Sequence, residues 1–190
     1  ADRYLTTMSV THVNLQLSAL MPAIYAGAAL ILVRRYSASR MWSQVRGHRA
    51  TVIQAMAMIV KTLMTQPVAS DERDHSVRAV HYFLPLPKGI KEAFEERYGV
   101  RLLNNYGSTE TLVGVVTDLP DGRSKWSSIG LAGPGYDVRI AGENGCVLPA
   151  GEQGEIQVRG EVGVSLMAGY WRNEQATRAA FTDDGWFRTG

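Results

Sequence analysis

Five consecutive residues just past the middle of the chain, Tyr106 to Glu110, combine an aromatic ring, a glycine, two hydroxyls and a carboxylate. These groups could bind a nucleotide. An aromatic face stacks on a base, a hydroxyl and the N–H groups of a helix start suit a phosphate, and a carboxylate suits Mg²⁺ bridging phosphate oxygens. The segment could equally be a polar turn, in which Gly107 has a positive φ and Ser108 or Thr109 caps a following helix. Taken alone, it leaves both alternatives open.

Two further groups of residues follow expected strands and are candidates for the same site. His12 comes after "YLTTM" at the start of an expected helix, although a lone His is more often structural than catalytic. Tyr82, Phe83 and Leu84 end another apolar segment. An aromatic pair belongs to the core by default, yet its place at a strand end is expected to put it at the border of the cleft that Tyr106 faces.

Motifs for several other chemistries are missing from the sequence. There is no G-x-x-x-x-G-K-[ST] loop and no G-x-G-x-x-G after a strand, and Ser108 is not in a G-x-S-x-G elbow. The single Cys146 excludes an internal disulfide and a cysteine zinc site. His48, His75 and His81 show no ligand spacing with Cys or carboxylates, so a metal–histidine site is not indicated.

Composition indicates an ordinary globular protein of 190 residues, 45% hydrophobic and 20% charged. The net charge of +2, without a basic block, gives no indication of nucleic-acid binding. The most apolar stretch, residues 15–33, contains Pro22 and Gly27 and predicts a buried helix followed by a buried strand, not a membrane span. No signal peptide opens the chain, and a cytoplasmic location is expected.

The elements that must position these residues alternate between strands and helices over residues 1–115, which predicts an α/β fold with a mostly parallel sheet layered with helices. Strands are expected at 29–33, 50–56, 77–84 and 100–106, and helices at 38–46, 58–64 and 88–99. Tyr106 then ends a strand, and ligands usually bind at the carboxyl edge of such a sheet. This position makes the nucleotide interpretation plausible.

Residues 116–190 differ from the first part of the chain in composition and in hydrophobic pattern. Glycine is dense in residues 116–170 and the helical period is lost, which predicts a small β-barrel-like subdomain. Asn173 is expected to cap a helix within 171–190, followed by a strand at "GWFRTG". The sequence therefore predicts three parts, 1–115, 116–170 and 171–190.

Four segments, in the order "NNYGSTE", "GEQGEIQVRG", "AGYWRNEQAT" and "DGWFRTG", resemble the adenylate-forming superfamily of acyl-CoA synthetases, luciferases and peptide-synthetase adenylation domains. The match spans nearly the whole chain, and the ordered set is far more specific than any one segment. Within the superfamily, "YSASRMWSQVRGHRATV", "RLLNNYGSTETLVG" and "KWSSIGLAG" are most similar to the subfamily of crotonobetaine/carnitine–CoA ligases.

The resemblance implies a two-step ligation of a small carboxylic acid, ATP with Mg²⁺, and CoA. It implies that Tyr106 stacks on adenine, that Thr109 hydrogen-bonds the α-phosphate and that Glu110 binds Mg²⁺. His12 falls where the family has the His of "P-x-F-H" near the acyl carboxylate, although this chain reads "SVTH" there. Groups that line the nucleotide and acyl pocket are implied around Asn104, Asn105, Gly107 and Ser108.

One departure from the family concerns the acyl pocket. The family commonly has "GGAPL" where this chain reads "YFLPL", residues 82–86. Two aromatic residues in place of glycines are expected to narrow the cleft. Aromatic faces also attract quaternary ammonium groups by roughly 0.5–2 kcal/mol, so a small, betaine-like acid is expected.

The resemblance also implies that parts of the site lie outside this chain. These are the triphosphate loop before Ala1, and the ribose-binding Asp, the hinge and the catalytic Lys after Gly190. The 190-residue chain alone is therefore expected to be inactive. Two alternatives remain, an adenylation domain that acylates a carrier protein and a non-catalytic nucleotide-binding module.

Overall fold

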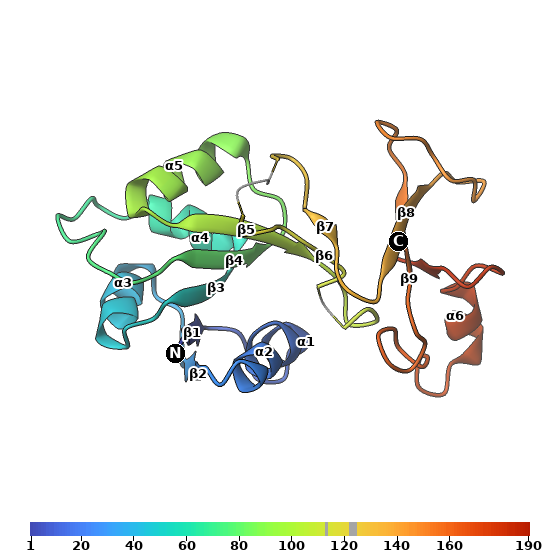
Figure 1. Ribbon diagram of the computed structural model, residues 1–190, viewed down its shortest axis with the longest axis horizontal. Coiled ribbons are helices and arrows are strands. Elements are labelled where there is room, and N and C mark those ends of the chain that lie inside the picture. The colour runs from blue at the N-terminus through green and yellow to red at the C-terminus, as the bar shows by residue number, and fades with distance from the viewer. Residues whose placement is uncertain (113, 122–124) are drawn as a thin grey trace. The chain divides into compact units, whose positions relative to one another are not determined.

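The computed structural model describes residues 1–112, 114–121 and 125–190, and it contains two compact units (Figure 1). The first unit comprises Ala1–Tyr106 and Thr117–Leu131, and the second comprises Gly107–Val116 and Ala132–Gly190. These limits differ from the expected divisions at 115 and 170. The chain leaves the first unit after Tyr106 and returns to it at Thr117, and the last twenty residues belong to the second unit.

The first unit is built on a parallel sheet, as the sequence predicted. The strands are β1 (Arg3–Thr6), β2 (Ala29–Leu32), β3 (Val52–Met56), β4 (Ala79–Phe83) and β5 (Arg101–Tyr106). Their order is β2-β1-β3-β4-β5, and each neighbouring pair is parallel. The two-residue strands β6 (Val116–Thr117) and β7 (Leu131–Ala132) follow β5 in the order of this sheet. Strand β2 is an edge strand in which Leu32 is 53% exposed, whereas the sequence predicted full burial.

Helices accompany the strands at the predicted places. They are α1 (Val13–Leu15), the π-helical turn η1 (Gln16–Leu20), α2 (Met21–Tyr25), α3 (Ala38–Gly47), α4 (Ala57–Met64) and α5 (Lys88–Tyr98). Helix α5 ends at Gly99, whose φ of 66° gives the left-handed C-cap that a glycine provides at low cost. Among the described residues, no helix has the length and apolar character that crossing a membrane requires.

The core of the first unit lies between the sheet and helices α3, α4 and α5. Alternate strand residues such as Leu5, Ile53 and Leu102 point to this side and pack with the fully buried Phe94 and Tyr98 of α5. Removing apolar surface from water at roughly 25 cal/mol per Å² is the main stabilising contribution of such a layer.

The second unit has a smaller sheet. Strands β8 (Asp137–Ala141), β9 (Glu155–Arg159) and β10 (Phe187–Arg188) are antiparallel in the order β10-β9-β8. Helix α6 (Glu174–Ala179) is capped as expected, because Asn173 Oδ1 accepts the Ala176 N–H at 3.0 Å. The described strands of this unit form an open three-stranded sheet, so the expected barrel-like closure is not confirmed.

Candidate functional site

The carboxyl ends of the parallel strands bring two of the predicted segments together. Tyr82 is paired with Asn104 and Phe83 with Asn105 across β4 and β5. Tyr106 follows as the last residue of β5 and is half-buried. Because every strand from β2 to β5 runs the same way, these residues share one edge of the sheet, visible where β4 and β5 end in Figure 1.

The residues predicted to narrow the acyl pocket lie in different surroundings. Tyr82 is 2% exposed and belongs to the core on the helix side, where burial raises the pKa of its phenol to about 12. This corrects the expectation that Tyr82 borders a cleft, because alternation along β4 directs it to the opposite face from Phe83. Leu84 is 59% exposed and has a φ of 77°, a strained conformation for a non-glycine residue at the end of a strand.

His12 lies at the start of the helix that follows β1, as predicted. It is exposed, and it is the N-cap residue of α1, where its Nδ1 accepts the Asn14 N–H at 3.0 Å. In the neutral ring this hydrogen bond leaves the proton on Nε2. The outer nitrogen can therefore donate a hydrogen bond to an acceptor such as a carboxylate.

A buried polar network fixes the helix after His12 to the strand ends. The Thr6 hydroxyl donates to Gln54 Oε1 at 2.6 Å. Gln54 Nε2 donates to Asn14 Oδ1 at 2.8 Å and to the Asn14 carbonyl at 3.0 Å. All three side chains are buried with partners, so the network stabilises one arrangement of β1, β3 and α1. The sequence did not reveal this network, since Gln54 stands in an apolar run.

Both polar atoms of the Asn105 side chain, Oδ1 and Nδ2, form hydrogen bonds. Thr117 Oγ1 donates to Asn105 Oδ1 at 2.5 Å, and Asn105 Nδ2 donates to the Leu103 carbonyl at 3.0 Å. His81 Nδ1 lies 3.5 Å from the same Nδ2. Burial, aided by the charge of Arg78, lowers the pKa of His81, so its ring is neutral at pH 7.

The neighbouring Asn104 stabilises the end of β5. Its Oδ1 accepts the Asn105 N–H at 2.9 Å, and its carbonyl accepts the Asp118 N–H at 2.9 Å. Both asparagines therefore have local structural roles that hold the strand leading to Tyr106. Their contact with a nucleotide stays a prediction.

In the second unit, the residues after Tyr106 form turns. The Ser108 N–H donates to Thr111 Oγ1 at 2.9 Å, and the Leu112 N–H donates to the Thr109 carbonyl at 3.4 Å. Over the described residues 107–112 no helix begins, so the expected helix N-terminus is a wrong prediction. The side chain of Thr109 is exposed.

The physical reason for the turns is that two carbonyls needed by a helix have other partners. The Glu110 carbonyl accepts the Met167 N–H at 2.7 Å. The Tyr136 hydroxyl lies 2.8 Å from the Thr111 carbonyl and 3.0 Å from the Ser165 carbonyl, and it donates to one of them. A helix would pair these carbonyls with N–H groups four residues further on.

The carboxylate of Glu110 is half-buried and accepts a hydrogen bond from Tyr170 Oη to its Oε1 at 3.0 Å. Burial by itself would raise the pKa of Glu110, but hydrogen bonds from its own N–H, Ser108 and Tyr170 outweigh that effect, and the pKa is lowered. Within the described ranges, no cluster of three His, Cys, Asp or Glu residues could hold a metal. A single ionised carboxylate that shares an ion with phosphate oxygens does fit the coordination of Mg²⁺.

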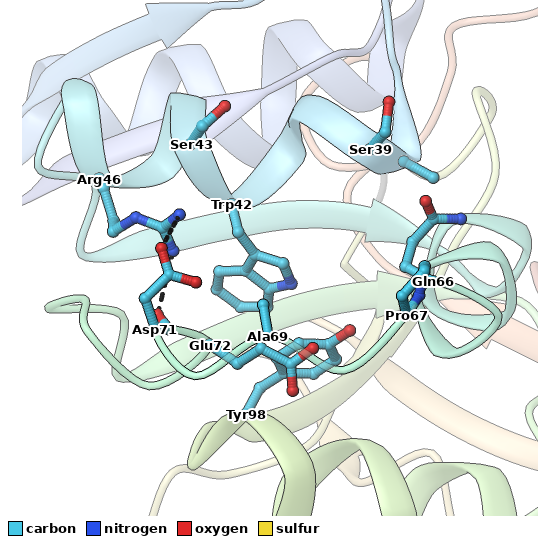
Figure 2. A pocket seen from close by; sticks show the side chains of 11 residues that line it. Ser39, Trp42, Ser43, Arg46, Gln66, Pro67, Ala69, Asp71, Glu72 and Tyr98 are labelled. Carbon is cyan, nitrogen blue, oxygen red and sulfur yellow. Dashed lines mark hydrogen bonds and ion pairs between the residues drawn. The ribbon is translucent and has the colours of Figure 1, made fainter.

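A pocket of about 210 Å³ lies in the first unit between α3 and the segment after α4 (Figure 2). It is lined by Ala38, Ser39, Trp42, Ser43, Arg46, Gln66, Pro67, Ala69, Asp71, Glu72 and Tyr98. Figure 2 shows Trp42 above Tyr98; the two rings are stacked, with their centroids 4.5 Å apart. None of the residues predicted to bind nucleotide or acid lines it.

One wall of this pocket is fastened by Arg97 of α5. Its guanidinium donates to the Met64 carbonyl at 3.1 Å and to the Gln66 carbonyl at 2.9 Å, and its Nε pairs with the Glu72 carboxylate at 3.0 Å. The hydrogen bonds from Arg97 lower the pKa of Glu72. The charged side chains of Arg97 and Glu72 therefore stabilise this wall of the pocket.

A parallel α/β sheet with a polar segment at the carboxyl end of its last long strand is the architecture of α/β proteins that bind a ligand at this edge of the sheet. Residues 1–171 match the family described as AMP-binding enzyme, and the chain belongs to this family. It is 44% identical over 189 residues to crotonobetaine/carnitine–CoA ligase of Escherichia fergusonii. The match covers 100% of this chain and 37% of that relative, so the chain spans little more than a third of the length of its curated relatives.

Solved structures of several similar proteins share the fold. A benzoate CoA ligase from Burkholderia xenovorans is 26% identical with a TM-score of 0.89, covering 100% of this chain and 38% of that one. O-succinylbenzoate CoA synthetase from Bacillus subtilis in complex with AMP is 29% identical with a TM-score of 0.82 and the same coverage. MatB from Rhodopseudomonas palustris with bound ATP is 25% identical with a TM-score of 0.88, covering 100% of this chain and 37% of that one.

Proposed function

We propose that this chain is part of an ATP-dependent carboxylate–CoA ligase. In the first step an oxygen of the acid bonds to the α-phosphorus of ATP and pyrophosphate leaves. In the second step the CoA thiolate bonds to the acyl carbon and AMP leaves. The proposal is carried by the run Tyr106–Glu110, which begins at the last residue of β5, in a chain of the AMP-binding enzyme family. Over 189 of its residues this chain is 44% identical to a CoA ligase.

The residues of the site have distinct roles in this proposal. Tyr106 stacks on adenine, the exposed Thr109 hydroxyl donates to the α-phosphate, and the ionised Glu110 holds Mg²⁺. When bound, the ion stabilises the charge that develops on the pyrophosphate oxygens. His12 donates from Nε2 to the carboxylate of the acid. Polar groups of Asn104, Asn105, Gly107 and Ser108 border the nucleotide and acyl pocket.

The acid is small and betaine-like in this proposal. Support comes from Phe83, which ends β4 at the carboxyl edge and is 7% exposed, and from Leu84, which follows it; Tyr82 belongs to the core on the opposite face of the sheet. Leu84 occupies volume there, and an aromatic face attracts a trimethylammonium group. Because the reaction consumes ATP and CoA, we place the enzyme in the cytoplasm.

The test uses the full-length protein and measures carboxylate-dependent pyrophosphate release. Trimethylammonium acids should react faster than medium-chain fatty acids, and the reverse order would contradict the substrate class. Acyl-AMP formation without transfer to CoA would favour a carrier-protein acceptor, and no pyrophosphate with any acid would favour a non-catalytic module. Tyr106→Ala should raise the KM for ATP about tenfold, since base stacking contributes about 1–3 kcal/mol.

A further inference from the structure

Glu110 is held at two points by one short segment of the second unit. The Met167 N–H donates to the Glu110 carbonyl at 2.7 Å, and the Tyr170 hydroxyl donates to Glu110 Oε1 at 3.0 Å. Met167 fixes the backbone, and Tyr170 fixes the carboxylate. Tyr170 lies 60 residues beyond Glu110 in the sequence, so only the fold brings them together.

Tyr170 is itself held in place from the start of α6. Its N–H donates to Thr177 Oγ1 at 2.8 Å, and that hydroxyl donates to the Asn173 carbonyl at 2.9 Å. Gly169 lies so close to Thr177 that a Cβ would stand 3.0 Å from its side chain. The backbone that presents the phenol is therefore anchored by contacts within the second unit.

We propose that Tyr170 is a positioning residue that orients the Glu110 carboxylate toward the Mg²⁺–nucleotide complex. This proposal rests on the proposed function, in which Glu110 binds Mg²⁺. A carboxylate has about four lone-pair positions, so one hydrogen bond leaves acceptor capacity for a cation. A carboxylate that is already oriented loses less rotamer entropy when the ion binds.

A purely structural role for the hydroxyl is the alternative, and the same unit offers a matched control. Tyr136 also donates its hydroxyl within this unit, but to the carbonyl of Thr111 or Ser165 and not to a carboxylate. Removing either hydroxyl deletes one hydrogen bond of comparable length. Only Tyr170→Phe removes a bond from the group that is proposed to bind the metal.

The experiment measures metal binding directly, in the full-length protein. Mn²⁺ affinity is determined by electron paramagnetic resonance with a non-hydrolysable ATP analogue, and half-saturating Mg²⁺ is determined from pyrophosphate release. Tyr170→Phe should weaken Mn²⁺ binding about tenfold and raise half-saturating Mg²⁺ to a similar extent, because the partners of metal ligands typically contribute 10- to 100-fold. Tyr136→Phe should lower the melting temperature and weaken Mn²⁺ binding less than Tyr170→Phe does, because its hydroxyl supports the turn that carries Glu110 and makes no bond to the carboxylate.

The possible outcomes separate this proposal from the proposed function. Unchanged Mn²⁺ affinity in Tyr170→Phe, with weakened affinity in Glu110→Gln, would overturn the role of Tyr170 alone. Unchanged affinity in Glu110→Gln would instead remove the metal assignment from the proposed function. p-Aminophenylalanine at position 170 restores a donor and should recover the affinity; a loss that it does not recover also overturns the proposal.

Discussion

The first unit packs a wide sheet against three helices, whereas the second unit has a core cluster of four buried residues, Val115, Val158, Leu166 and Phe187. In the second unit, backbone segments approach closely at glycines. A Cβ on Gly154 would stand 2.4 Å from the Ala141 carbonyl oxygen, and one on Gly133 would stand 2.8 Å from the Gly114 carbonyl oxygen. The two units therefore differ chiefly in the size of their cores, because close approaches at glycines occur in both: a Cβ on Gly130 of the first unit would stand 1.9 Å from the Thr117 carbonyl oxygen.

The largest expected effect is that of a cavity in the first unit. Phe94→Ala should lower the free energy of unfolding by about 3–5 kcal/mol, because the ring is 1% exposed and its neighbours cannot fill the space. Urea unfolding gives the magnitude, and hydrogen exchange should assign the loss to the first unit. Met58→Ala, at a side chain that is 58% exposed, is the control and should change stability by less than about 0.5 kcal/mol.

An added methyl group at a crowded glycine should destabilise the second unit. Gly154→Ala should lower the free energy of unfolding of this unit by about 1–3 kcal/mol, because the new Cβ would collide with the backbone of β8, which cannot move aside as a flexible side chain could. Gly47→Ala at the end of α3 is the same substitution in open space and should be neutral or stabilising. Equal destabilisation by the two substitutions, in thermal unfolding, would show that the close approach of Gly154 to β8 does not limit stability.

The smallest expected effect is a pH dependence of the stability of the first unit, which contains all four histidines. Burial lowers the pKa of His75 and His81 below the ordinary 6.5. The unfolded chain therefore binds more protons than the folded one once the pH falls below about 6.5, and stability should decrease from pH 7.5 to 5.5. Replacing both residues by Gln should flatten this slope. An equal slope in the double variant would show that other groups are responsible.

Local signals in the sequence were enough for most of the fold. Asn173 and Gly99 mark helix ends through their own hydrogen bonding and φ preference, and the apolar alternation marks the strands. Tyr106 could be placed at a strand end on the same basis.

Other features of the candidate site depend on contacts between distant segments. The partnership of Glu110 with Tyr170 spans 60 residues, and no local pattern indicates it. The turns after Thr109 form because carbonyls are taken by Met167 and Tyr136, which a helix-cap argument cannot anticipate. The face to which Tyr82 points follows from the register of β4, and a shift of one residue would reverse it.

Arg97 has a consequence for how the first unit opens. The described residues 66–78 contain no helix or strand, yet one guanidinium binds the Gln66 and Pro67 carbonyls at the start of this segment and the carboxylate of Glu72 within it. Release of that single side chain frees all of its contacts together, whereas Asp71 further along the segment is held separately by Arg46 at 2.7 Å. The part of the segment before Asp71 should therefore open when Arg97 leaves its place, and the rate at which a protease cuts there reports that opening.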